Sequence, residues 1–309
     1  MTMISRSLLI RVAFSAVLGA VLAASQTGCS TVAQGLAAAG QATGVMTPAQ
    51  GESLVKTAEA VGKTFEDITP EQEYYIGRSV GATIISTYNV YDNPKATAYL
   101  NTLGQSVAKF SDMPETFRGY YFLILDTDEV NAFAAPGGFI FISRGMIRLC
   151  SSEDDLAAVI AHEVGHVQHK HAVRAIKSSR LTSALTTIAV EAGKQLGPDA
   201  LNQVTEAFEG SITDITKTMM NSGYARGQER EADRAAITIL KRMGYRQGSL
   251  PDVLERMGAV LENDKRGFGS THPPAGDRVK ELRPLINDMD TPVPTAARQK
   301  RFEQNIKGI

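Results

Sequence analysis

The feature that most constrains this chain is one long helix, predicted from Glu153 to about Ala175. Ser151 or Ser152 can cap its first turn, because a serine hydroxyl accepts a hydrogen bond from a free backbone N–H there. The acidic residues that follow suit the positive end of the helix dipole. Apolar residues then recur at helical spacing, so one face should pack against a core; they are Leu156, Val159 and Ile160.

The same helix carries the pattern His162-Glu163-Val164-Gly165-His166. Residues four apart lie on nearly the same face of a helix, so both imidazoles can reach one ion, while Glu163 projects beside them and can accept a proton from a water molecule. Such spacing also occurs by chance on surface helices, but here it falls on a capped, buried helix in a chain with only 5 histidines. The pattern therefore predicts a metal site. His169 and His171, in a basic stretch beyond it, are predicted to face solvent.

A third metal ligand must come from another segment, because a catalytic zinc site normally has three protein ligands and keeps one position for water. The best candidate is a second predicted helix that begins within residues 224–236. Glu229 and Asp233 share one face of it, so one can bind metal while the other holds a ligand histidine by its second nitrogen. The run also fits a solvated face with ion pairs, and spacing alone barely separates Glu229 from Glu231.

Three separated motifs together resemble those of peptidase family M48, a family of zinc metallopeptidases. They are the histidine pattern of the first helix, Glu229 followed by Asp233, and the run NAFAAPGGFIFISRGM at residues 131–146. The motifs occur in the family's order, and the resemblance covers about residues 70–285. It implies an α+β, mostly helical zincin-like domain with a short β-sheet beside the active-site helix.

The resemblance also implies a role for each residue of the site. One Zn²⁺ ion per chain would be held by His162, His166 and Glu229, so the family pattern favours Glu229 over the acidic residue two positions later. Glu163 would be the catalytic base that takes a proton from water. Asp233 would support a ligand histidine.

Short apolar runs predict a small β-sheet. Residues 120–125 are β-prone, and residues 131–143 indicate two strands around Pro136-Gly137-Gly138; most other segments from residue 52 onward are predicted helical. The resemblance suggests that the last strand is the sheet edge on which an extended substrate lies by β-addition. Its candidate substrate-contacting residues are Phe139, Ile140, Phe141 and Ile142.

A proline-stiffened loop, Ser270-Thr271-His272-Pro273-Pro274, precedes a helix predicted from about Ala275 to Asn287. This loop, with Arg278, also resembles a family feature. His272 could occupy the open metal position and keep the enzyme inactive, or move aside and stabilise an oxyanion. It could equally cap or pack against the helix, and the sequence leaves these alternatives open. Residues 177–223, helical but poorly patterned, are candidates for a lid.

The N-terminus has the pattern of a targeting segment. A short apolar stretch follows two arginines and leads to Gly28-Cys29-Ser30, as at the end of a bacterial lipoprotein signal. Residues 1–28 would be the signal peptide, Cys29 the lipidated residue, residues 29–50 a flexible tether and residues 51–309 one peptidase domain. The expected location is the outer membrane, facing the periplasm. An ordinary secretory signal, giving a soluble periplasmic protein, is the alternative.

Composition narrows the classes of partner. A net charge of −1 gives no reason to expect nucleic acid, and 6% aromatic residues with no Trp argue against a stacking-based sugar or base binder. The expected partners are protein or peptide substrates and, through the lipid anchor, a membrane; the oligomeric state is left open. The predicted function is a zinc metalloendopeptidase that hydrolyses misfolded or misassembled envelope proteins. The alternative is a zinc-stabilised chaperone or assembly factor with latent peptidase activity.

Overall fold

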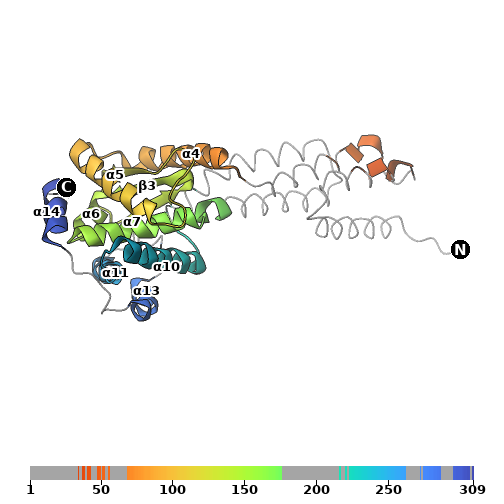
Figure 1. Ribbon diagram of the computed structural model, residues 1–309. Coiled ribbons are helices and arrows are strands. Elements are labelled where there is room, and N and C mark those ends of the chain that lie inside the picture. Colours follow the sequence, from red (N-terminus) through yellow and green to blue (C-terminus); the bar gives the residue numbers. More distant parts are fainter. Residues whose placement is uncertain are drawn as a thin grey trace. The chain divides into compact units, whose positions relative to one another are not determined.

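The computed structural model describes residues 68–175, 223–261, 274–286 and 295–306, with isolated positions between 34 and 55 and at 216, 220, 272, 308 and 309. Residues Ile68–Ile176 and Ile212–Ile309 form one compact unit, which holds every element discussed below. Its described helices (Figure 1) are α4 (Pro70–Tyr88), α5 (Pro94–Lys109), α6 (Arg144–Leu149), α7 (Glu153–Gln168), α10 (Arg226–Met243), α11 (Ser249–Leu261), α13 (Ala275–Leu282) and α14 (Ala296–Ile306), with 3-10 turns η1 (Pro136–Gly138) and η2 (Arg283–Leu285).

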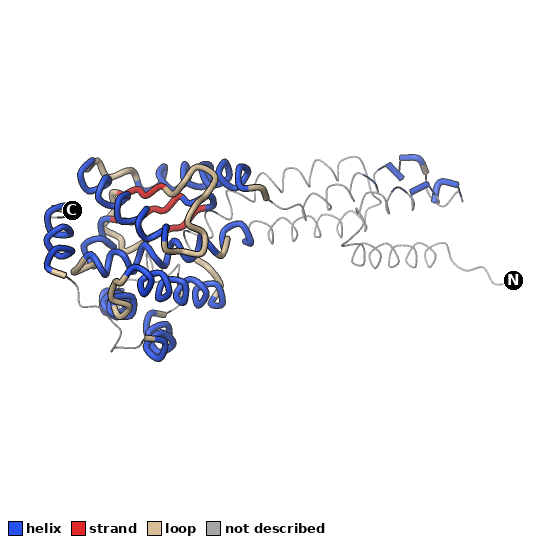
Figure 2. The backbone as a smooth tube through the Cα atoms, in the orientation of Figure 1, coloured by secondary structure: helices blue, strands red, loops and turns tan. Residues whose placement is uncertain are grey.

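A three-stranded sheet lies among these helices (Figure 2). Its strands are β1 (Tyr121–Leu125), β2 (Ala132–Ala135) and β3 (Phe139–Ser143), in the spatial order β1-β3-β2. β1 runs parallel to β3 and β2 runs antiparallel to it. Gly137 has φ 73° in the turn between β2 and β3, and a Cβ there would lie 2.8 Å from Tyr74 Cα, so the position requires glycine. These strands and their turn confirm the sequence prediction.

Both faces of the sheet are covered by helices. Side chains alternate along β3, so that Ile140 and Ile142 point into the main core with α5 and α7, whereas Phe141 packs with Phe133 and α4 on the opposite face. This two-sided burial explains why the strands read as nearly continuous apolar runs rather than as an alternation of apolar and polar residues.

The prediction that β3 is the substrate edge is wrong. β3 is the central strand, and its backbone pairs with β1 on one side and with β2 on the other. The side chains of Ile140, Phe141 and Ile142 are buried, and Phe139 is half-buried. These four residues therefore build the core between two helical layers, and the strand has no free edge to offer.

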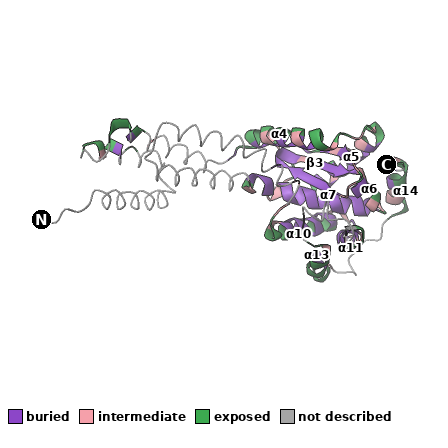
Figure 3. Cartoon of the chain, turned by 180° about the vertical axis from the view of Figure 1, so that it is seen from behind, coloured by how far each residue is buried: buried purple, intermediate pink, exposed green. Residues whose placement is uncertain are grey.

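Helix α7 is buried along almost its whole length (Figure 3). The predicted cap is present: Ser152 Oγ accepts a hydrogen bond from the backbone N–H of Asp155 at 3.2 Å. The three acids of the first turn are buried, and each meets an arginine from a later helix; the pairs are Glu153 with Arg301, Asp154 with Arg298 and Asp155 with Arg256. These ion pairs attach α11 and α14 to the start of α7.

Helix α7 ends at Gln168, earlier than the predicted end near Ala175. Lys170 has a φ of 52°, in the left-handed region, which breaks the helix before a short helical turn resumes over residues 171–175. The chain therefore changes direction immediately after the histidine pattern.

Helix α10 crosses α7 at very close range. A Cβ on Gly165 would lie 2.8 Å from the carbonyl oxygen of Ala232 and 3.0 Å from its Cα. Real Cβ atoms do not come that close to a backbone, so the glycine in the histidine pattern permits this approach.

Several predictions lie outside the described residues. They are the signal peptide 1–28, the lipidated Cys29, most of the tether 29–50 and nearly all of the lid candidate 177–223. The start of the peptidase domain at residue 51 likewise stays a prediction. Within the described ranges, no helix combines the length and the hydropathy needed to cross a membrane.

Candidate metal-binding active site

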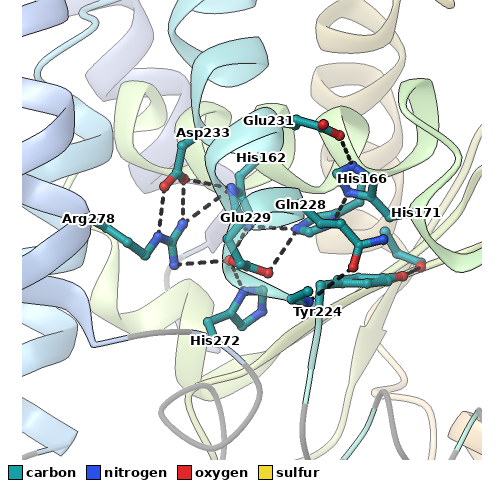
Figure 4. Close-up of polar contacts among 12 residues, drawn as sticks. His162, His166, His171, Tyr224, Gln228, Glu229, Glu231, Asp233, His272 and Arg278 are labelled. Carbon is teal, nitrogen blue, oxygen red and sulfur yellow. Dashed lines mark hydrogen bonds and ion pairs between the residues drawn. The ribbon is translucent and has the colours of Figure 1, made fainter. Parts of the chain in front are cut away.

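Helix α7 brings the two predicted metal-binding histidines together (Figure 4). Their Nε2 atoms lie 3.0 Å apart, and both rings are buried. Two ring nitrogens at this distance need a proton or a cation between them, because two lone pairs would repel. Burial, reinforced by the positive charge of a protonated His162, lowers the pKa of His166 well below its ordinary value, so His166 is the neutral imidazole that metal binding requires.

Helix α10 supplies the third predicted group, Glu229. Its Oε1 lies 3.4 Å from His166 Nε2, and its Oε2 lies 3.6 Å from His162 Nε2. Burial alone would raise the pKa of Glu229, but the neighbouring histidines and Arg278 hold that pKa below its ordinary value. The carboxylate is thus ionised beside the two imidazoles.

The structure places Glu229 and Glu231, which spacing alone barely separates, on different sides of α10. Glu231 lies on the other side of α10, where its Oε2 is 2.9 Å from His171 Nε2, and its side chain is partly exposed. Glu229 alone of the two faces the histidine pair.

Asp233 and Arg278 lie behind the cluster. Asp233 Oδ1 is 3.0 Å from His162 Nδ1, the nitrogen that faces away from His166. Arg278, on α13, donates to both oxygens of Asp233 at 2.9 and 2.5 Å. Although burial opposes ionisation of Asp233, Arg278 keeps the pKa of this carboxyl far below its ordinary value. The Arg278 guanidinium is engaged by Asp233 through these two hydrogen bonds. A regulatory or oxyanion role for Arg278 stays a prediction.

Glu163 points into a small pocket that it shares with β2, Tyr224 and His272. The carboxyl is buried, and its Oε1 has no hydrogen-bond partner. Burial raises the pKa of Glu163 to about 7, a rise that nearby Glu229 reinforces and His162 opposes. A carboxylate with a pKa near neutrality, lacking a partner and facing a pocket, can exchange a proton with a small molecule there.

His272 reaches the cluster, as one of the predicted alternatives requires. Its Nδ1 lies 2.6 Å from Glu229 Oε2, and the side chain is buried. Burial lowers the pKa of His272 to about 4, in spite of the opposing effect of Glu229. His272 therefore faces the cluster, whereas a histidine that only packed on α13 would not.

The residues present fit a divalent metal. His162, His166, Glu229 and His272 each offer a ligand atom, and these atoms lie within 4.8 Å of one another. Glu229 Oε1 is buried without a hydrogen-bond partner, which is costly in a protein interior unless a cation is bound. Imidazole nitrogens combined with one carboxylate are donors that zinc accepts.

Two neighbours of the cluster were not predicted from the sequence. His171, predicted to face solvent, is fully buried, because the break at Lys170 turns it back so that its Nδ1 lies 2.8 Å from His166 Nδ1. Tyr224 stacks on the His166 ring with centroids 4.2 Å apart, and its hydroxyl donates to the Ala134 carbonyl at 2.9 Å. No periodicity or motif in the sequence marked either contact.

A buried helix that presents two histidines and a glutamate, crossed by a helix that adds a second glutamate, fits the active site of a metallopeptidase. Residues 94–286 match the profile of peptidase family M48. This match covers well over half of the chain, so the chain belongs to family M48 and the resemblance seen in the sequence is confirmed.

The names of similar proteins agree with this assignment. The chain is similar to the beta-barrel assembly-enhancing protease of Yersinia pestis, at 28% identity over 76% of this chain and 50% of that protein. A putative beta-barrel assembly-enhancing protease of Vibrio cholerae is 31% identical over 70% of this chain and 44% of that protein. Metalloprotease LoiP of Escherichia coli is 25% identical over 65% of this chain and 73% of that protein. The chain thus spans half or less of the first two relatives.

Proposed function

We propose that this chain is a zinc metalloendopeptidase. The observation that carries the proposal is the buried cluster of His162, His166 and Glu229 next to Glu163, whose carboxylate oxygen lacks a hydrogen-bond partner. A site that only stabilised the fold would not need an unpaired, buried carboxyl beside it, because leaving such a group unpaired costs free energy.

The proposed roles follow from these positions. His162, His166 and Glu229 would hold one Zn²⁺ ion, which when bound polarises the scissile carbonyl and makes water more acidic. Glu163 accepts the proton of the attacking water and delivers it to the leaving amine nitrogen. Asp233 and Arg278 hold the His162 ring by its Nδ1 nitrogen, so that its Nε2 nitrogen stays directed at the ion.

The free edge of β2 is the proposed substrate-binding edge. Among the described strands, β2 pairs on one side only, and Ala132, Phe133 and Ala134 line the pocket of Glu163. An extended peptide could add to this edge with its scissile bond beside Glu163. Tyr224 donates its hydroxyl to the Ala134 carbonyl, so a peptide that pairs there would displace it.

The proposed substrates are misfolded or misassembled envelope proteins. This rests on the names of the Yersinia and Vibrio relatives, which refer to the assembly of β-barrels, and on the lipoprotein-like segment that ends at Cys29. The proposed location is therefore the outer membrane, facing the periplasm, through a lipid on Cys29. Cells that produce Glu163→Gln as their sole copy should accumulate misassembled outer-membrane proteins; normal levels of these proteins would refute this substrate class.

A second candidate function is favoured by His272. Four buried ligands could close the coordination sphere, as in structural zinc sites, which would leave the peptidase latent and the chain an assembly factor. In casein degradation, His272→Ala should be more active than the unaltered chain if His272 blocks the site. Lower activity with zinc retained would instead indicate that His272 assists catalysis. An assembly factor would tolerate Glu163→Gln in cells.

A further inference from the structure

The second ring nitrogen of His166 faces another histidine. His166 Nδ1 lies 2.8 Å from Nδ1 of His171, and both rings are buried. On the far side of its ring, His171 Nε2 lies 2.9 Å from Glu231 Oε2, and Arg174 donates to the same oxygen at 2.5 Å. His166, His171 and Glu231 thus form a continuous line of polar contacts that leads away from His162 and Glu229 (Figure 4).

A break in the helix creates this line. On an uninterrupted helix, residues five apart differ by about 140° in direction, so His171 could not face His166. Helix α7 ends at Gln168, and Lys170 takes a left-handed φ of 52° before the chain turns helical again. A non-glycine residue rarely adopts this conformation, and here it returns His171 to the back of the His166 ring.

With both imidazole rings neutral, the contacts admit one consistent arrangement of protons. The Glu231 carboxylate accepts a hydrogen bond, so His171 carries its proton on Nε2 and its Nδ1 is a lone pair. That lone pair accepts from His166, which must then carry its proton on Nδ1. A neutral His166 protonated there has a lone pair on Nε2, the nitrogen that faces His162 and Glu229.

We propose that His171 and Glu231 are positioning residues, which hold His166 in the orientation and tautomer that leave its Nε2 nitrogen free to bind the metal. This inference rests on the proposed zinc site. His171 would hold His166 by its Nδ1 nitrogen, as Asp233 holds His162 by its Nδ1 nitrogen. Glu231 would act through His171, because it contacts that residue and not the metal-binding residues. Groups that orient a ligand histidine in this way are typically worth about 10- to 100-fold in metal affinity or activity.

The test compares the zinc affinity of purified full-length variants, measured by competition with a chelator. His171→Leu fills a similar volume but cannot accept a hydrogen bond, so it should lose about 10- to 100-fold in affinity. In His171→Asn, the side-chain oxygen can replace the Nδ1 acceptor and should restore much of this loss. His169→Leu is the matched control, because His169 stacks on the His171 ring with centroids 5.6 Å apart but makes no described polar contact with it, and it should leave zinc affinity unchanged.

A spectroscopic readout separates positioning from general damage. The visible absorption of the Co²⁺-loaded chain reports ligand geometry, and it should change in His171→Leu but not in His169→Leu. Glu231→Leu replaces a partly exposed side chain, so this variant tests the same line of contacts if His171→Leu does not fold. It should also weaken zinc binding. Glu281→Leu, an exposed acid on α13 that pairs with Arg230, is its control.

The outcomes distinguish this inference from the proposed function. If the unaltered chain binds zinc and both His171→Leu and Glu231→Leu bind it as tightly, with an unchanged Co²⁺ spectrum, the positioning role is wrong and the zinc site stands. If the unaltered chain binds no zinc, the proposed function itself fails.

Discussion

At the scale of single residues, the burial of Glu163 favours catalysis but lowers the stability of the folded chain. The carboxyl is buried, its Oε1 has no hydrogen-bond partner, and burial raises its pKa from the ordinary 4.5 to about 7. A group with these properties suits proton transfer near neutral pH but destabilises the folded chain whenever it is ionised.

The stability of the metal-free chain should therefore depend on pH through Glu163. The folded state binds this proton more tightly than the unfolded state does, so the free energy of unfolding falls as pH rises from about 4.5 to about 7 and stays low above it. Glu163→Gln removes the ionisation and should make the chelator-treated protein more stable by about 3 kcal/mol at pH 8. Below pH 4.5 this advantage should vanish.

Urea unfolding at several pH values measures this difference, with Glu281→Gln as an exposed control. An equal free energy of unfolding for Glu163→Gln and the unaltered chain at pH 8 would show that Glu163 is not strained in the folded state.

Local spacing in the sequence was enough to predict the contact between His162 and His166, because both lie on one helix. The choice of Glu229 over Glu231 needed the family pattern, since the two are only two residues apart and local charge does not separate them. His171 could not be predicted at all. Its place depends on the left-handed conformation of Lys170, and lysine is not a residue that signals such a break.

At the scale of secondary-structure elements, the site depends on how closely α7 and α10 approach. Glu229 reaches the histidines because the backbone of Ala232 lies against Gly165, where a Cβ would come within 2.8 Å of a carbonyl oxygen. The distance between the two helices therefore sets the distance between the third ligand and the first two.

Gly165→Ala should disturb the metal site as well as stability. The added methyl group forces α10 away from α7, at a cost of about 1–3 kcal/mol, and moves Glu229 from His162 and His166. We expect a lower melting temperature and weaker zinc binding. The control is Gly276→Ala on α13, where a Cβ meets nothing within 4 Å. Unchanged zinc affinity in a folded Gly165→Ala variant would contradict the account of helix spacing.

The sequence predicts where the strands lie along the chain but not how they are ordered in the sheet. Their apolar runs and the Pro136-Gly137-Gly138 turn were enough to locate β1, β2 and β3. The order of the strands in the sheet could not be predicted in this way. β3 lies between the other two strands, and it pairs in parallel with β1 although β2 separates them in the sequence. The predicted edge was therefore the wrong strand. Which strand lies in the middle depends on long-range pairing that a local pattern does not record.

At the scale of the whole molecule, the C-terminal helix completes the burial of α7. Glu153 is fully buried and accepts hydrogen bonds from Tyr99, Tyr245 and Arg301. Only Arg301, on α14, brings a positive charge to this carboxylate among the contacts described. The start of the active-site helix thus depends on a segment far from it in sequence.

A chain that ends at residue 294 should therefore be less stable by about 3–5 kcal/mol, because it loses the buried side chain of Phe302 as well as the charge partner of the buried Glu153. Glu153→Gln in the shortened chain should recover part of the loss, because the amide can still bond with both tyrosines without needing a counter-charge. Thermal unfolding of the two shortened chains and the full chain measures this. No recovery would mean that α14 acts through apolar packing and not through Glu153.

Casein degradation by the purified full-length chain and by Glu163→Gln, with zinc content measured on both, tests directly whether Glu163 and the histidine pair form a zinc peptidase site. Both proteins should bind one zinc ion per chain, and Glu163→Gln should lose about 100- to 10,000-fold in rate, because only the proton-transferring group is gone. Equal rates for the two proteins, or no zinc in the unaltered chain, would contradict the proposed zinc peptidase site.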